Sequence, residues 1–123
     1  MKKKSIIKWL AKPRADDYDA AETYLSLVMN ARLASRLAKK LSKESAVSFK
    51  AKDIFRASEL PLLGAGNFHV EEDRQKIAAG KALSPLLLVR DDVNRKVIIA
   101  DGYHRLCAVY TYDEDALIPC RIV

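Results

Sequence analysis

The stretch "IADGYHRLCAVYTY" (Ile99–Tyr112) decides how this chain is expected to fold. An apolar run ends at Asp101, and "DGYHR" (101–105) then opens a second segment. We therefore predict a strand that ends near Asp101 and a helix from about Tyr103 to Tyr112. A helix start leaves backbone N–H groups without partners inside the helix, so this junction is also a place where an anion can bind.

The segments around this stretch predict a small mixed sheet with packed helices. Pro85 opens the apolar run "LLLV" (86–89), and the turn "RDDVNR" (90–95) leads back into "KVIIA" (96–100). These runs are expected to form a β-hairpin with a loop of about five residues. The apolar end "LIPCRIV" (117–123) predicts a last strand. This order of strands and helices is typical of the α+β class.

The middle of the chain predicts shorter elements. Weak alternation over Ser48–Lys52 favours a short strand, and "GAGN" (64–67) favours a turn because no G-K-[ST] follows the glycines. A helix is expected from about Val70 to Ala79, where Gly80 ends it. Its first turn is acidic, and its inner side is expected to hold Val70, Arg74, Ile77 and Ala78.

The N-terminal part predicts one long helix from Tyr18 to about Ser42, because this segment contains no Gly or Pro. Apolar residues recur there at steps of three and four and define one face: Tyr24, Leu27, Val28, Ala31, Ala34, Ala38 and Leu41, widened by Leu33 and Leu37. Acidic residues lie near its start and lysines near its end, which complements the helix dipole. We divide the chain into a basic helical segment over residues 1–45 and a domain over residues 46–123.

The net charge of +6 is concentrated toward the N-terminus. Four basic side chains of the long helix are expected to share a stripe: Arg32, Arg36, Lys39 and Lys43. Such a stripe fits a phosphate backbone, so one alternative function is a non-enzymatic module that binds nucleic acid or an acidic protein. An ordinary solvated helix face explains the same pattern. A further alternative is a homodimer formed through the residue 18–42 helix.

The composition favours a globular cytoplasmic protein. Half of the residues are hydrophobic, but no apolar run approaches the roughly 20 residues that cross a bilayer, so no membrane contact is expected. The basic start "MKKKSIIKWLAKPR" (1–14) has an apolar patch too short for a secretory leader. Cys107 and Cys120 belong to no C-x-x-C motif or Cys/His cluster, so we expect buried thiols rather than a zinc site.

The residue types of the "DGYHR" junction point to a bound anion, most naturally a phosphate. Gly102 lets the backbone approach a ligand, Arg105 offers forked donors, and His104 offers another donor. Asp101 has the wrong charge to contact a bare phosphate, and it fits a Mg²⁺ ion, a substrate hydroxyl or amine, or a proton better. The alternative without function is that Asp101 caps the helix, Gly102 relieves a tight turn, and the other two side chains lie on the surface.

Three segments in this order resemble the ParB/sulfiredoxin superfamily: "FHVEEDRQKIAAGKALSPLLLV" (68–89), "KVIIADGYHRLCAVY" (96–110) and "IPCRIV" (118–123). The resemblance covers about Leu60 to Val123, roughly half of the chain. It implies the fold of that superfamily for this region. It also implies a nucleotide ligand (ATP, ADP or CTP) with Mg²⁺, in a small phosphotransferase or nucleotide hydrolase.

The motif is most similar to the D-G-H-H-R branch that includes free-serine kinases. By this resemblance, the nucleotide phosphates contact Gly102, Tyr103, His104 and Arg105, and Asp101 places the metal or the substrate. The catalytic base would be Glu71 or Glu72, which follow His69, although acids in a first turn also complement the helix dipole. Tyr103 stands where sulfiredoxins have a cysteine, so reduction of a sulfinic acid is not expected.

Overall fold

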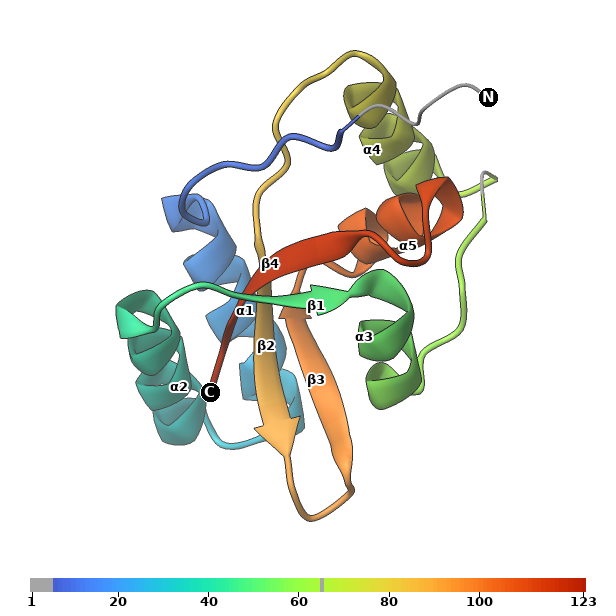
Figure 1. Cartoon of the computed structure of the whole chain (residues 1–123). Coiled ribbons are helices and arrows are strands. Elements are labelled where there is room, and N and C mark those ends of the chain that lie inside the picture. The colour runs from blue at the N-terminus through green and yellow to red at the C-terminus, as the bar shows by residue number, and fades with distance from the viewer. Residues whose placement is uncertain (1–5, 65) are drawn as a thin grey trace.

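The computed structural model describes residues 6–64 and 66–123, which form five helices and four strands. The α+β class predicted from the sequence is therefore confirmed. In chain order (Figure 1), the elements are α1 (Ala15–Val28), α2 (Ala31–Lys43), β1 (Val47–Lys50), α3 (Ala51–Ser58), α4 (Phe68–Ala78), β2 (Leu86–Asp91), β3 (Lys96–Asp101), α5 (Tyr103–Tyr112) and β4 (Leu117–Ile122).

The four strands form one mixed sheet in the order β1-β4-β2-β3. β2 and β3 are the predicted antiparallel hairpin, β1 pairs antiparallel with β4, and β4 lies parallel to β2. The β2–β3 ladder pairs Leu87 with Asp101 but Leu88 with Ile99, so Ala100 is left over as a bulge. A bulge commonly redirects the chain beside it, and this one directly precedes the "DGYHR" junction.

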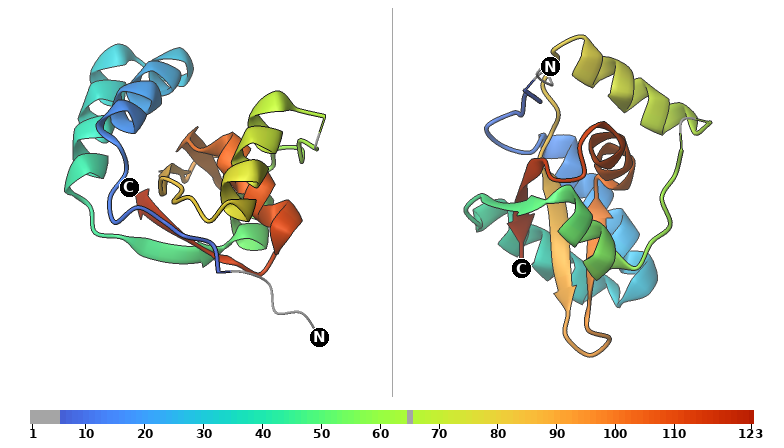
Figure 2. Two further views of the ribbon diagram at one scale, coloured as in Figure 1. Left: turned by 90° about the horizontal axis from the view of Figure 1, so that it is seen from above. Right: turned by 45° about the vertical axis from the view of Figure 1, so that its right-hand side comes forward.

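Helices cover both faces of the sheet. Alternate residues of a strand point to opposite sides, so each strand contributes side chains to both faces. Helices α1 and α2 lie on one side and α3, α4 and α5 on the other (Figure 2). On the first side, a core cluster unites Ala21, Leu25, Ala34 and Leu41 with Leu87, Val89 and Ala100. On the second, Leu86, Leu88, Val97 and Ile99 pack with Ile54, Ile77 and Leu106. The N-terminal helices therefore share a core with the sheet.

The prediction of one long N-terminal helix is wrong. Helix α1 ends at Val28, Met29 and Asn30 are extended, and α2 begins at Ala31. The Asn30 side chain accepts a hydrogen bond from the Leu33 N–H at 2.9 Å, which caps the second helix and favours a break over continuation. The predicted apolar face is wrong for five residues that are exposed: Tyr24, Leu27, Val28, Ala31 and Leu33. In α1, Ala21 and Leu25 pack against the sheet instead.

Other elements differ in detail from the predictions. The strand expected over 48–52 covers Val47–Lys50, and the unpredicted α3 follows at once. Helix α4 begins before Val70 because the Asn67 side chain accepts hydrogen bonds from the His69 and Val70 N–H groups. Its buried residues are Val70, Asp73 and Ile77, so the prediction that Arg74 and Ala78 face inward is wrong.

Several predictions near the C-terminus are confirmed. Helix α5 covers Tyr103–Tyr112, as expected, and the turn of the β2–β3 hairpin lies within 90–95. Cys107 and Cys120 are free, buried thiols.

In the part of the chain that the structure describes, no helix combines the length and the apolar character that crossing a membrane requires.

Candidate functional site

The junction between β3 and α5 is built around Gly102. Its φ of 111° lies in the left-handed region, and a Cβ atom placed there would come within 2.7 Å of Leu86 Cγ and 3.0 Å of Arg105 Nη2. Only glycine therefore fits this position without strain. No side chain caps α5, so the alternative in which Asp101 caps this helix is wrong. The first N–H groups of α5 have no acceptors within the helix.

A polar pocket of about 220 Å³ opens at the start of α5, where α5 packs against α4. The sequence predicted several of its lining residues: Glu72, Asp101, Gly102, Tyr103, His104 and Arg105. Three more were not predicted as site residues, namely His69, Asp73 and Lys76. These three and Glu72 lie at steps of three and four on α4, so helical periodicity applied to polar residues would have found them.

Glu71 lies outside this pocket. Its carboxylate is 3.5 Å from Arg74 Nη1, and both residues line a separate cavity with Tyr112. The sequence offered Glu71 and Glu72 as equivalent candidates for a base. The structure places only Glu72 beside His104 and Arg105.

Arg105 is held by two carboxylates from different parts of the chain. Its Nη2 atom donates to Asp101 Oδ2 at 2.9 Å and to the Pro85 carbonyl at 3.3 Å, and it lies 3.8 Å from Asp17 Oδ2. Asp17 also accepts a hydrogen bond from the Ser84 hydroxyl. The Arg105 Nε atom is buried and has no hydrogen-bond partner among the described residues. The contribution of Asp17 was not predicted, because nothing local in the sequence links α1 to this junction.

The two histidines of the protein meet in the pocket. The ring centroids of His69 and His104 are 5.0 Å apart. Burial lowers the pKa of His104 below its usual value and the nearby His69 acts in the same direction, whereas Asp73 opposes the shift. His104 is therefore expected to be neutral at pH 7, unless an anion binds beside it.

The pKa values of two acidic side chains in the pocket are raised above their usual range. Burial raises the pKa of Asp73, although Lys76 Nζ lies 3.7 Å from its carboxylate and opposes this shift. Burial likewise raises the pKa of Asp101 against the opposing effect of Arg105. Both shifts favour the neutral form of these carboxyl groups relative to ordinary aspartates.

Tyr103 shapes the pocket with its ring and anchors a loop with its hydroxyl. The hydroxyl donates to the Pro61 carbonyl, and the ring lies 5.8 Å from that of His104, centroid to centroid. The hydroxyl is thus engaged with the protein's own backbone. Tyr103 contributes a wall rather than a free polar group.

Two predicted roles concern residues outside the pocket or a metal ion: the basic stripe of α2 and the Mg²⁺ ligand Asp101. The stripe of Arg32, Arg36, Lys39 and Lys43 is exposed on α2, and none of these residues lines the pocket. Asp101 was predicted to bind Mg²⁺. Within residues 6–64 and 66–123, no group of three or more His, Cys, Asp and Glu side chains is arranged to hold a metal ion.

Taken together, the pocket presents backbone N–H groups, two imidazoles, an ammonium group and a guanidinium group beside three carboxylates. Donors of this kind can receive a doubly charged oxyanion, and the carboxylates can accept protons from a neighbouring hydroxyl or amine. No family model, curated protein or solved structure matches this chain.

Proposed function

We propose that this protein binds a phosphate group of a nucleotide (ATP, ADP or CTP) at the start of α5, in a cytoplasmic domain of the ParB/sulfiredoxin type. One observation carries the proposal: the uncapped N-terminus of α5 opens into a pocket that His104, Arg105 and Lys76 also line. A helix N-terminus attracts anions through its free N–H groups and its dipole. Gly102 allows the tight junction that begins this helix, because a Cβ atom there would clash with the buried Leu86.

The size of the pocket limits how much of a ligand enters it. Pockets that hold a whole small molecule usually measure about 300–1,000 Å³, and this one measures about 220 Å³. A phosphate group therefore fits inside, while the sugar and the base of a nucleotide rest outside. This arrangement predicts weak discrimination between bases.

The existing ion pairs determine which groups receive the phosphate first. Arg105 is engaged with Asp101 and Asp17, and Lys76 lies near Asp73. The α5 N–H groups and the imidazoles of His69 and His104 are the donors that remain for a ligand. A bound phosphate would favour the protonated form of His104, whose pKa is otherwise lowered.

We assign the base of any phosphoryl transfer or hydrolysis at this site to Glu72, since Glu71 does not reach the pocket. Asp101 also lines the pocket but is paired with Arg105, and Asp73 lies near Lys76. Such chemistry depends mainly on positioning and on stabilisation of charge. The carboxylates present do not form a ready-made metal site, because Asp101 Oδ2 already accepts from Arg105. Mg²⁺ therefore enters the proposal as an ion carried by the nucleotide, and no step is assigned to it.

Calorimetric titration with ADP, ATP and CTP, each with and without Mg²⁺, tests the binding. His104→Ala should weaken the affinity about tenfold, because one donor to a charged group is lost. Lys43→Ala removes a charge from α2, far from the pocket lining, and should leave the affinity unchanged. Arg105→Ala is a poor probe, since it leaves Asp17 and Asp101 without their partner. Equal binding by the His104 and Lys43 variants would refute the proposal.

Release of phosphate or formation of ADP tests turnover. Glu72→Gln should reduce the rate by at least about a hundredfold if Glu72 is the base. Glu71→Gln is the matched control, with the same change one residue away and outside the pocket, and it should retain the rate. Equal rates in the two variants would remove Glu72 from the reaction.

A second candidate function is binding of nucleic acid through α2. Arg32, Arg36, Lys39 and Lys43 are exposed, and no ion pair joins them to a carboxylate in the described part of the chain. Affinity for DNA or RNA should then fall steeply with salt. Replacing Arg32, Arg36 and Lys39 together by Ala should lower the slope of log K against log salt by about 0.7–0.9 per lost contact. Binding that is absent or independent of salt would exclude this candidate.

A further inference from the structure

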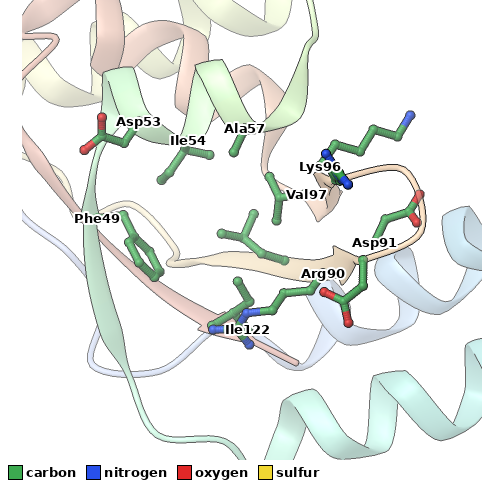
Figure 3. Close-up of a pocket in the computed structure, with 12 residues that line it drawn as sticks. Phe49, Asp53, Ile54, Ala57, Arg90, Asp91, Lys96, Val97 and Ile122 are labelled. Carbon is green, nitrogen blue, oxygen red and sulfur yellow. The ribbon is translucent and has the colours of Figure 1, made fainter.

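A second and larger cavity lies at the other end of the same sheet face. It measures about 490 Å³ and shares no lining residue with the pocket at the start of α5. Figure 3 shows Phe49, Ile54, Val97 and Ile122 turned toward one hollow between α3 and the sheet. The proposed phosphate site does not account for this cavity.

The cavity exists because α3 is short. This helix ends at Ser58, and Glu59 adopts a left-handed conformation (φ of 58°) that turns the chain away. The hairpin end of the sheet therefore extends beyond the helix. Leu88 and Val97 of this lining belong to the core cluster, and Phe49 and Ile122 pack against it. An apolar cavity of this size is typical of small-molecule sites.

Arg90 occupies a position on this face that strand alternation would give to an apolar residue. It pairs with Val97 across the hairpin and follows Leu88 at a step of two, so its side chain points to the same side as those two. In Figure 3 its guanidinium group lies beside Ile122 at the edge of the hollow. No ion pair joins Arg90 to a carboxylate among residues 6–64 and 66–123.

Three carboxylates line this cavity, those of Asp53, Asp91 and Asp92, and the first two are engaged elsewhere. Asp91 accepts hydrogen bonds from the backbone and the side chain of Asn94, and it lies opposite Lys96 in the hairpin ladder. Asp53 lies in the first turn of α3, where a negative charge complements the helix dipole, and its carboxylate points away from the hollow (Figure 3). Asp92 and Arg95 lie in the hairpin turn and Lys96 begins β3, whereas Arg90 lies within β2 on the same side as the apolar residues Leu88 and Val97. Arg90 is therefore the charged residue placed beside the apolar lining.

We infer that this cavity binds a small organic anion with an apolar body, such as an aromatic sulfonate or a medium-chain carboxylate. The apolar body contacts Phe49, Leu88, Val97 and Ile122, and the anionic group pairs with Arg90. Bidentate pairing suits a guanidinium group and a carboxylate or sulfonate. Burial of the apolar body supplies the remaining affinity.

Fluorescence titration with anilinonaphthalene sulfonate tests the inference, with octanoate as a competitor. One molecule should bind per chain, and octanoate should displace it. Arg90→Gln should weaken the binding about tenfold or more, because a charge-assisted pair is lost. Arg56→Gln is the matched control: this arginine belongs to α3 but lines other cavities, so its loss should change nothing.

Two further experiments distinguish the contribution of the Arg90 charge from that of the apolar cavity. Neutral phenylnaphthylamine has a similar apolar body, so it should bind the wild type and Arg90→Gln equally. Ala57→Trp, at an exposed position of the lining, should fill the space and abolish binding of both dyes. Circular dichroism checks that this variant is folded. In an NMR titration of the wild type, octanoate should shift the methyl signals of Val97 and Ile122. Unchanged sulfonate binding in Arg90→Gln, or octanoate shifts confined to other methyl groups, would overturn the inference.

Discussion

Individual residues at the β3–α5 junction illustrate which features can be read from sequence. Gly102, His104 and Arg105 stand out in the sequence, and the structure places all three at one pocket. The partners of Arg105 do not stand out. Asp17 is 88 residues away from it in the chain, and its proximity depends on how α1 packs against the sheet. Contacts of this kind follow from tertiary packing rather than from local pattern.

Replacement of Gly102 by alanine should destabilise the protein by at least about 2 kcal/mol. The left-handed φ is unfavourable for alanine, and the added Cβ atom would clash with Leu86. Chemical denaturation followed by circular dichroism measures the change. Gly66→Ala is the matched control, since its Cβ atom would meet nothing within 4 Å. An equal loss of stability in the two variants would contradict the strained geometry assigned to Gly102.

Anion binding at the pocket should tighten as the pH falls below about 6.5, the usual pKa of histidine. Sulfate is the appropriate probe, because it keeps its double charge over this range while phosphate does not. The pKa of His104 is lowered, so this side chain gains its proton below its usual range, and a bound anion stabilises the protonated form. His69, Asp73, Glu72, Asp101, Lys76 and Arg105 face the same space.

The share of His104 in this effect is measured by comparing His104→Gln with the wild type. Titration calorimetry at several pH values should show a flatter profile in the variant. Parallel profiles would mean that the other pocket groups cause the whole dependence.

At the scale of elements, the sequence predicts helices and strands best where one local signal is unopposed. The β2–β3 hairpin and α5 were predicted closely, because apolar runs, a turn and Gly102 all agree there. The long helix over 18–42 was not, because Asn30 looks like an ordinary polar residue until its side chain is seen to cap α2. Helix α3 was missed, since it follows β1 without an intervening turn residue.

Removal of the cap at Asn30 should therefore weaken α2. Asn30→Ala is expected to cost about 1 kcal/mol, while Asn30→Ser should cost much less because serine also caps helices well. Thermal and urea unfolding measure both variants. A larger loss in the serine variant than in the alanine variant would contradict the capping role.

At the scale of the whole molecule, α1 and α2 are part of the core and also carry exposed apolar and charged side chains. They bury Leu87, Val89 and Ala100 of the sheet, so the segment before residue 46 completes one face of the domain. On the outside, Leu27 is 81% exposed and Val28 52%. Exposed acids of α1, namely Asp16, Asp19 and Glu22, complement the exposed bases of α2. A two-fold pairing of two such hairpins would match these charges and cover the apolar side chains.

We propose a salt-sensitive homodimer through the α1–α2 hairpin as the alternative to nucleic-acid binding by the same bases of α2. Sedimentation velocity over a series of concentrations measures it. Leu27→Glu should shift the equilibrium to the monomer, whereas Val93→Glu, a similar change at an exposed position in the β2–β3 turn, should not. A wild type that remains monomeric at the highest concentration would rule out this arrangement.

The most direct test of the central claim is an amide NMR titration of the isotope-labelled protein with Mg²⁺-bound ADP. If the start of α5 receives the phosphates, the largest shifts should fall on the N–H groups of Tyr103, His104 and Arg105, with smaller ones on α4 near His69. Shifts confined to α2 or to the cavity beside Arg90, or no shifts at millimolar ADP, would contradict the claim.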